Sequence, residues 1–201
     1  MPSDVESAME SLILVFHRYA SEEGGYYTVS RDKLKQLMKT ELPSYLQAQK
    51  DPAVIDKMMK DLDASGGGQI NFEQFFCLIA GFSISCEKAY QMKLKKTKKK
   101  IMPSELETAM ESLITVFHRY ASKQGRSGTL SRRELRELME NELSNFLKSQ
   151  QDATAIDKIM RDLDTNGDGQ VDFEEFVSLV VGLSIACEQC YQMHMKNVAK
   201  K

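Results

Sequence analysis

The sequence is an internal duplication, and this repeat constrains the fold more than any other feature. A shift of 101 residues aligns the two halves without a gap, and about half of the aligned positions are identical. Residues 8–21 read AMESLILVFHRYAS and residues 109–122 read AMESLITVFHRYAS. Because a duplicated unit of this kind is one structural module used twice, we interpret the fold repeat by repeat. We assign the first repeat to residues 1–92, a lysine-rich linker to 93–102 and the second repeat to 103–201.

Each repeat carries the pattern of four helices. Capping boxes, in which a glutamate follows a serine by three positions, begin the first helix at Ser3 and at Ser104. The next helix is expected near 31–41, a third is expected to end near Leu62, and the fourth begins at Phe72. The sequence therefore predicts an all-α fold with two helix–loop–helix units per repeat.

Composition places the chain among ordinary folded proteins. It is 42% hydrophobic and 28% charged, with a formal net charge of −2. Four cysteines are too few and too uneven for a disulfide framework, so we expect reduced thiols and a cytoplasmic protein, with export without a signal peptide left open. The linker segment KLKKTKKK is interpreted as a solvated helix end. A patch for an anionic membrane or an acidic partner is the alternative.

The strongest motif is DTNGDGQVDFEE, residues 164–175, which fits the twelve-residue calcium loop D-x-[DN]-x-[DN]-G-x5-E. Calcium prefers six to eight hard oxygen ligands, which this spacing supplies. The predicted ligands are Asp164, Asn166, Asp168, the backbone carbonyl of Gln170, and the bidentate carboxylate of Glu175.

The equivalent loop of the first repeat, DASGGGQINFEQ, has lost most of these ligands. It keeps Asp63 but has Ser65, Gly67 and Gln74 where the second repeat has Asn166, Asp168 and Glu175. Since ligand charge sets calcium affinity over several decades, we expect this loop to be silent.

A second loop lies upstream in each repeat, at residues 121–134 in the second one. On composition alone, Ser131 and Glu134 form a capping box. However, a unit of about a hundred residues with a long neutral or basic loop before an acidic one resembles the S-100 family of EF-hand calcium sensors. That resemblance implies calcium binding through backbone carbonyls and one carboxylate, here Ala121, Gln124, Arg126, Thr129 and Glu134. In the first repeat Lys33 stands at the position of Glu134, so we expect little binding there.

The resemblance covers the whole chain twice, as in the dicalcin-like tandem members of the family. The first repeat is similar to the annexin-binding light chain, a member that lacks calcium ligands and stays open. The resemblance implies two EF-hand-pair, S-100-type four-helix units that pack as an intramolecular pseudo-dimer through their first and last helices. The stripe from Val5 to Tyr19 would then meet its counterpart from Leu106 to Tyr120.

The resemblance also implies an apolar target cleft in each repeat, which would receive an amphipathic helix such as an annexin N-terminal segment. In the second repeat its walls would be Phe146, Leu147, Ile156, Leu183, Cys187, Cys190 and Tyr191. In the first repeat they would be Leu46, Ile55, Phe82, Cys86 and Tyr90.

We expect a calcium sensor or adaptor whose second repeat opens on binding calcium and whose first repeat is insensitive to it. A constitutive annexin-type scaffold and a simple calcium buffer are the alternatives. The sequence offers no catalytic constellation, so an enzyme is not expected, nor is a nucleic-acid partner. Membrane contact is expected only indirectly or through the linker. A zinc site at Cys187, Cys190 and His194 is a weaker alternative.

Overall fold

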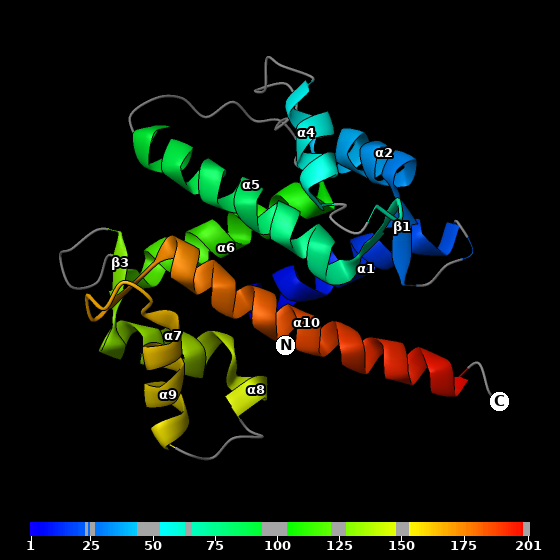
Figure 1. Ribbon diagram of the computed structural model, residues 1–201. Helices are drawn as coiled ribbons and strands as arrows, with labels where there is room; N and C mark the ends of the chain where they lie inside the picture. The colour runs from blue at the N-terminus through cyan, green and yellow to red at the C-terminus, as the bar shows by residue number, and fades with distance from the viewer. Residues whose placement is uncertain are drawn as a thin grey trace.

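The computed structural model describes residues 1–22, 24, 27–43, 53–62, 66–93, 104–121, 128–147 and 153–198. The first repeat forms α1 (Asp4–Glu22), β1 (Thr28–Ser30), α2 (Arg31–Glu41), α4 (Ala53–Leu62), β2 (Gln69–Asn71) and α5 (Phe72–Lys93). The second repeat forms α6 (Glu105–Ala121), β3 (Thr129–Ser131), α7 (Arg132–Glu142), α8 (Ser144–Leu147), α9 (Ala153–Leu163), β4 (Gln170–Asp172) and α10 (Phe173–Val198) (Figure 1). The predicted helical tandem architecture is confirmed. Apart from its first residue, the predicted linker 93–102 lies outside the described residues.

Local signals begin the helices where the sequence predicts. The Ser3 hydroxyl accepts a hydrogen bond from the Glu6 amide at 3.1 Å, and the Ser3 amide donates to the Glu6 carboxylate at 3.3 Å. Ser104 and Glu107 repeat the arrangement at 3.1 and 3.4 Å. Both capping boxes are therefore formed, each at the start of the first helix of its repeat.

Short strands join the two loops of each repeat, a feature that the sequence analysis did not predict. β1 pairs with β2 and β3 pairs with β4, each antiparallel over three residues. The central pairs are Val29 with Ile70 and Leu130 with Val171, and all four side chains are fully buried. Three-residue strands are too short to show an alternating pattern in sequence, so only their apolar central residue marks them.

Aromatic rings form the centre of each repeat. The Phe117 ring lies 5.3 Å from that of Phe173 and 5.5 Å from that of Phe176, centroid to centroid. Phe16 packs against Phe72 and Phe75 in the first repeat in the same way. These contacts hold the first helix of each repeat against the first turns of its last helix, where the loop that precedes this last helix ends.

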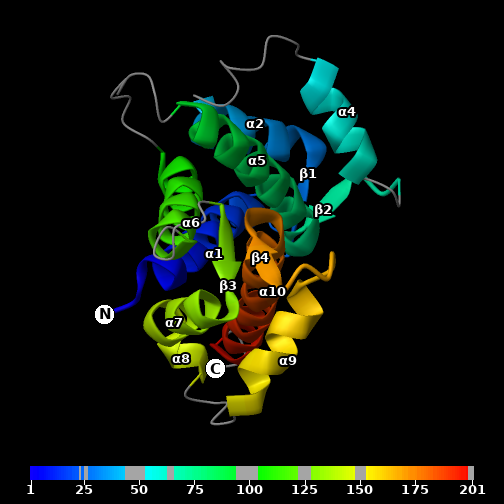
Figure 2. The same cartoon turned by 90° about the vertical axis from the view of Figure 1, so that its left-hand side faces the viewer.

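The two repeats pack against one another along their first and last helices. α1 contacts α6, which lies next to it in Figure 2, and α5 contacts α10, which runs beside it in Figure 1. The predicted stripe of α1 is buried throughout, since no member is more than 6% exposed: Val5, Met9, Leu12, Phe16 and Tyr19. The expected packing of the first and last helices is present within this single chain.

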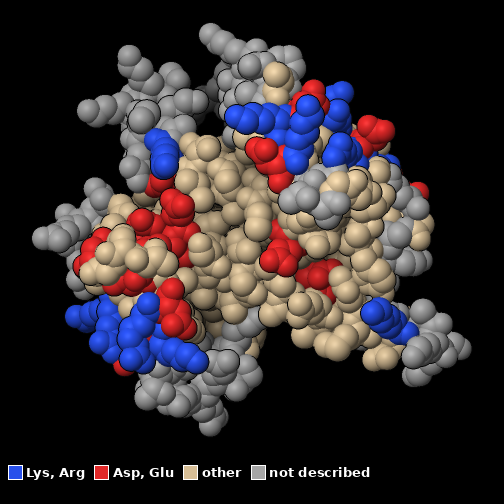
Figure 3. Space-filling view, viewed as in Figure 1, with Lys and Arg blue, Asp and Glu red and all other residues tan. Residues whose placement is uncertain are grey.

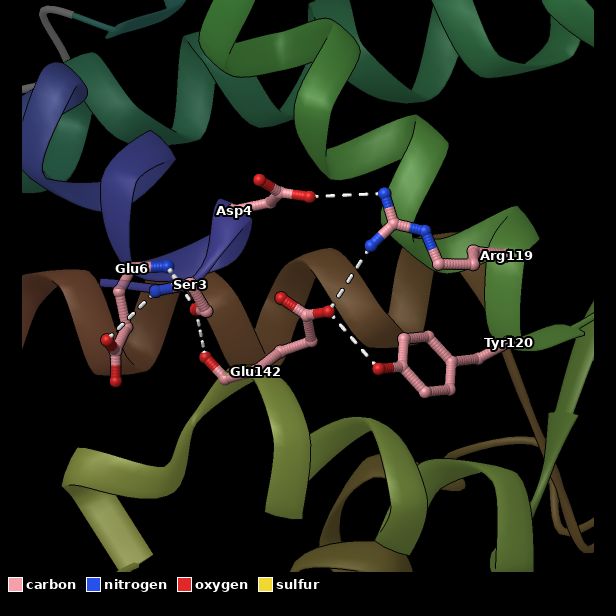
Figure 4. Close-up of polar contacts among 6 residues, drawn as sticks. All are labelled: Ser3, Asp4, Glu6, Arg119, Tyr120 and Glu142. Atoms are coloured by element: carbon pink, nitrogen blue, oxygen red, sulfur yellow. Dashed lines mark hydrogen bonds and ion pairs between the residues drawn. The ribbon is translucent and has the colours of Figure 1, made fainter. Parts of the chain in front are cut away.

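Polar contacts surround this interface and cross from one repeat to the other. Glu142, at the end of α7, accepts hydrogen bonds through its carboxylate from Tyr120 at 3.1 Å and Arg119 at 3.4 Å. Its backbone carbonyl accepts one from the Ser3 hydroxyl, and Arg119 also binds Asp4 at 3.1 Å (Figure 4). The Ser104 hydroxyl donates in the same way to the backbone carbonyl of Glu41. The second helix of each repeat is therefore hydrogen-bonded to the N-cap residue of the first helix of the other repeat.

The last helix, α10, is long and apolar enough to cross a membrane by length and composition alone. Core helices of folded domains meet the same criterion, so this is weak evidence. In this fold its first turns are buried in the core through Phe173, Phe176 and Val180, and it carries the buried carboxylates of Glu175 and Glu188.

Candidate calcium-binding loops

The loop at residues 164–175 connects α9 to α10 and contains β4. Gly167 and Gly169 have positive φ angles of 72° and 74°, a backbone region that glycine enters at little cost. These two residues turn the chain sharply enough to bring the first half of the loop back over its second half.

Side-chain oxygens of the loop accept hydrogen bonds from its own backbone. The Asp164 carboxylate accepts from the amides of Asp168 and Gly169 at 3.1 and 2.9 Å, and the Asn166 side chain accepts from the Asp168 amide at 2.9 Å. The Asp168 carboxylate accepts from the Gln170 amide at 2.8 Å. The predicted ligands at positions 1, 3 and 5 are thus oriented by the loop itself.

Glu175, the predicted bidentate ligand, is only 6% exposed and links the two ends of the loop. One carboxylate oxygen accepts from the Thr165 amide at 3.1 Å, and the other accepts from the Asp172 amide at 3.1 Å. Within the described residues, no three His, Cys, Asp or Glu side chains gather closely enough to hold a metal. The donor set nevertheless fits calcium, because every side chain directed into the loop offers oxygen.

The upstream loop of the second repeat ends at Glu134, which both the capping-box and the ligand interpretation involve. One carboxylate oxygen accepts from the Ser131 amide at 2.8 Å and from its hydroxyl at 2.9 Å, which confirms the capping box. The other oxygen is buried and has no hydrogen-bond partner among the described residues. A buried carboxylate oxygen without a donor is costly, and a cation would satisfy it.

The remaining predicted ligands of this loop are placed only in part. Ala121 is the last residue of α6 and is buried, and Thr129 begins β3. Gln124 and Arg126 lie outside the described residues. Their ligand roles stay predictions.

In the first repeat Lys33 stands at the sequence position of Glu134. Lys33 forms an ion pair with Glu22 at the end of α1, and its ammonium lies 3.2 Å from the Gln36 side-chain oxygen. It also lies 5.7 Å from the centroid of the Tyr19 ring. This side chain is only 14% exposed, so a fixed positive charge occupies the end of the loop.

Gln74 stands at the position of Glu175 and uses both ends of its amide. Its nitrogen donates to the Leu62 carbonyl at 2.9 Å, and its oxygen accepts from the Asn71 amide at 3.0 Å. The last position of this loop therefore holds a neutral side-chain amide instead of a carboxylate, and the NH2 group of this amide is directed at the end of α4. Asp63 and Ser65 lie outside the described residues.

Comparison with known proteins decides the family. The S-100/ICaBP type calcium binding domain matches residues 5–49 and again 106–150, and the EF hand domain matches residues 155–183. Protein S100-A10 of Gallus gallus is 50% identical over 100 residues, which cover 50% of this chain and all of that protein. The chain belongs to the S-100 family.

Other S-100 proteins show similar coverage. Protein S100-A10 of Homo sapiens is 48% identical over 100 residues. A solution structure of S100A5 in its calcium-bound states is 34% identical and covers 46% of this chain and 97% of that one, with a TM-score of 0.42. Because the S-100 domain matches twice, the chain is a tandem S-100 protein. Its domains are of a calcium-binding, non-enzymatic type.

In this S-100 protein a groove runs between α1 of the first repeat and α10 of the second. It encloses about 330 Å³ and is lined by Glu6, Met9, Glu10, Ile13, Leu14, Asn145, Cys187 and Tyr191. Two predicted cleft residues, Cys187 and Tyr191, thus lie together. Leu183 is half-buried against the core, and Cys190 is exposed. The side chains of Phe146, Leu147 and Ile156 lie outside the described part of the structure.

The wall of this groove that comes from the first repeat was not predicted. The sequence analysis assigned each cleft to one repeat, whereas Met9, Ile13 and Leu14 come from the other one. Leu14 is 41% exposed, unusual for a leucine on an otherwise buried helix, and it could have drawn attention because Thr115 replaces it in the second repeat.

A second cleft, of about 320 Å³, lies between α4 and α5 of the first repeat. It is lined by Met58, Asp61, Leu62, Cys77, Leu78, Gly81, Phe82 and Ser85. Phe82 is the predicted cleft residue found there, and Cys86 is half-buried against the core. Leu46 and the side chains of Ile55 and Tyr90 lie outside the described residues.

The thiols in these two clefts are held in their neutral form. Burial is the main cause that raises the pKa of Cys187, and the nearby Cys190 and Glu6 raise it further. Burial is also the main cause that raises the pKa of Cys77, and Glu73 adds to it. Because the thiolate is the reactive form of cysteine, both thiols are unreactive at neutral pH and line their clefts as neutral side chains.

Proposed function

We propose that this protein is a calcium-gated adaptor with one calcium-sensitive and one calcium-insensitive half. Calcium in the second repeat opens a groove for an amphipathic target helix, and the first repeat presents its cleft whether or not calcium is present. The observation that supports this most directly is the contrast between Glu134, with its unsatisfied buried oxygen, and Lys33, which carries its own charge into the equivalent loop.

The groove chemistry supports a helical target. Leu14 is exposed in the groove with the buried Met9 and Ile13 beneath it, and Glu6 and Glu10 form an acidic rim on the same helix. A helix with one apolar face and basic flanking residues would complement both features. By the resemblance to the annexin-binding light chain, an annexin N-terminal segment is the target that we propose.

Peptide binding with and without calcium separates this proposal from its alternatives. We expect a synthetic annexin N-terminal peptide to bind one site per chain in chelator and two in calcium, measured by calorimetry. Equal stoichiometry and affinity in both conditions would indicate the constitutive scaffold. Calcium uptake with no peptide bound in either condition would indicate a buffer.

The role of Lys33 can be tested by restoring the carboxylate that the second repeat has. Lys33→Glu is expected to raise the calcium affinity of the first loop about tenfold, because ligand charge tunes such loops over several decades. A calcium titration should show a third, weak ion in this variant.

Lys35→Glu is the matched control, since it makes the same charge change on α2 but pairs with Asp56 outside the loop, at 2.9 Å. An equal gain in this control would show that net charge alone attracts the ion. No gain in either variant would show that Lys33 does not block the loop.

We further propose that the chain acts as a cytoplasmic monomer, with its internal pairing in place of a dimer, because a tether raises the local concentration of the second unit. Sedimentation of the intact protein tests this, since a dimer at micromolar concentration would contradict it. Fractionation of expressing cells and their medium tests the location.

A further inference from the structure

Four arginines gather on the outer surface of the second repeat, away from the grooves described above. Arg132, Arg133 and Arg136 lie on the first turns of α7, and Arg161 lies on the last turn of α9. We call them the α7–α9 arginine cluster. They contribute to the basic region over α7 and α9 at the lower left of Figure 3.

A single carboxylate lies at the centre of the cluster. Asp157 accepts a hydrogen bond from Arg132 at 2.9 Å and lies 3.7 Å from Arg136. The hydrogen bond from Arg132 is the main cause that lowers the pKa of Asp157, with smaller contributions from Arg136 and Arg161. The carboxylate is therefore ionised at neutral pH, and it balances one of the positive charges around it.

A cavity is present at the same place. It encloses about 340 Å³ and is lined by Arg132, Asp157, Met160 and Arg161. This volume is at the lower end of the range for small-molecule sites. Arg132 is 60% exposed, so the site is open to solvent and its guanidinium can be reached.

The position of these arginines is unfavourable for the helix itself. The N-terminal end of a helix carries a partial positive charge, which disfavours cations in the first turn. The one acidic residue of that turn, Glu134, is directed inward and is only 4% exposed. Stability of α7 therefore does not explain the pair Arg132–Arg133.

The first repeat shows that the fold does not require this charge. Its equivalent positions hold Arg31, Asp32, Lys35 and Lys60, and of these Lys35 and Lys60 are near Asp56. Arg132 and Arg31 are thus the same in both repeats, whereas Arg136 and Arg161 replace the ammonium groups of Lys35 and Lys60. A guanidinium binds two oxygens of one phosphate at once, which an ammonium does not.

We propose that the α7–α9 arginine cluster binds a phosphate ester, carried either by a phosphoinositide headgroup or by a soluble inositol phosphate. Arg132 and Arg161 hold the phosphate from two helices. The two sources share the same chemistry, so the experiment must separate them.

Binding is measured with the full chain and two probes. The first is inositol trisphosphate in calorimetry, and the second is phosphatidylcholine vesicles with and without phosphatidylinositol bisphosphate, in cosedimentation. The double variant Arg132→Gln/Arg161→Gln is expected to lose at least about tenfold in affinity for whichever probe binds, because two charge-assisted contacts are removed. Arg31→Gln/Lys60→Gln, at the equivalent positions, is expected to bind as the wild type does.

The outcomes separate the sources and test the proposal. Binding of both probes, or of the vesicles alone, identifies a lipid headgroup as a ligand, and binding of trisphosphate alone identifies the soluble source. Binding of neither probe, or binding of a glutamate-rich peptide in their place, overturns the proposal. Equal losses in both double variants would show that net charge alone sets the binding, and no loss in either would place vesicle binding elsewhere, such as the lysine-rich linker. Both results overturn the proposal. Unchanged calcium titrations and thermal unfolding show that each variant is folded.

Discussion

Glu175→Gln is expected to lower the calcium affinity of the loop at 164–175 about 100-fold, because it removes the bidentate carboxylate from a site whose affinity follows ligand charge. Glu175 also bonds the amides of Thr165 and Asp172 at opposite ends of the loop. A glutamine keeps the shape and one acceptor oxygen, so the variant isolates the charge. Calorimetric titration of the intact chain should fall from two ions to one weak ion.

Glu174→Gln is the matched control, since it removes a charge from the next residue, whose side chain is exposed. Its titration should resemble that of the wild type. Four ions in the wild-type chain would contradict the interpretation of the first repeat, because Lys33 and Gln74 would then leave their loops competent. Two tight ions in Glu175→Gln would contradict the assignment of the loop itself.

Phe117→Ala is expected to lower the free energy of unfolding by about 3–5 kcal/mol, the usual cost of removing a buried phenylalanine ring. Phe117 is fully buried and its ring contacts those of Phe173 and Phe176, so the variant leaves a cavity between α6 and α10. Urea unfolding in chelator, followed by helical circular dichroism, measures the loss.

Phe16→Ala removes the equivalent ring of the first repeat, whose contacts with Phe72 and Phe75 are at similar distances of 5.5 and 5.3 Å. We expect both variants to shift one shared transition, since α1 and α6 pack against each other. Two separate transitions, with each variant affecting only one, would contradict tight packing between the repeats. A loss below about 1 kcal/mol would show that the cavity collapses.

Features that depend on neighbouring residues were predicted well from the sequence. The capping boxes at Ser3 and Ser104, the helix 31–41 and the start of α5 at Phe72 follow from signals within a few positions. The stripe that α1 buries followed from its periodicity. The same local logic identified the loop at 164–175, whereas the calcium role of the upstream loop and the meaning of Lys33 followed only from the resemblance to the S-100 family.

Features that depend on contacts between distant segments were missed or were predicted only from resemblance. The pairs His17–Glu188 and His118–Glu87, at 3.2 and 3.1 Å, join residues of different repeats that no local pattern connects. The groove wall around Leu14 faces a helix more than a hundred and fifty residues later in the chain. The arginine cluster likewise combines α7 with α9, so its charge becomes visible only when the two helices lie together.

The reciprocal contacts between the repeats also have a consequence for stoichiometry. Arg18 of the first repeat binds Glu105 of the second at 2.8 Å, and Arg119 binds Asp4 in return at 3.1 Å. Two such units made as separate chains would sort into like and unlike pairs according to their amounts in the cell. One chain makes the unlike pair obligatory at a fixed ratio of one to one, so the proposed combination of a metal-responsive half and a metal-blind half would not be lost through subunit exchange.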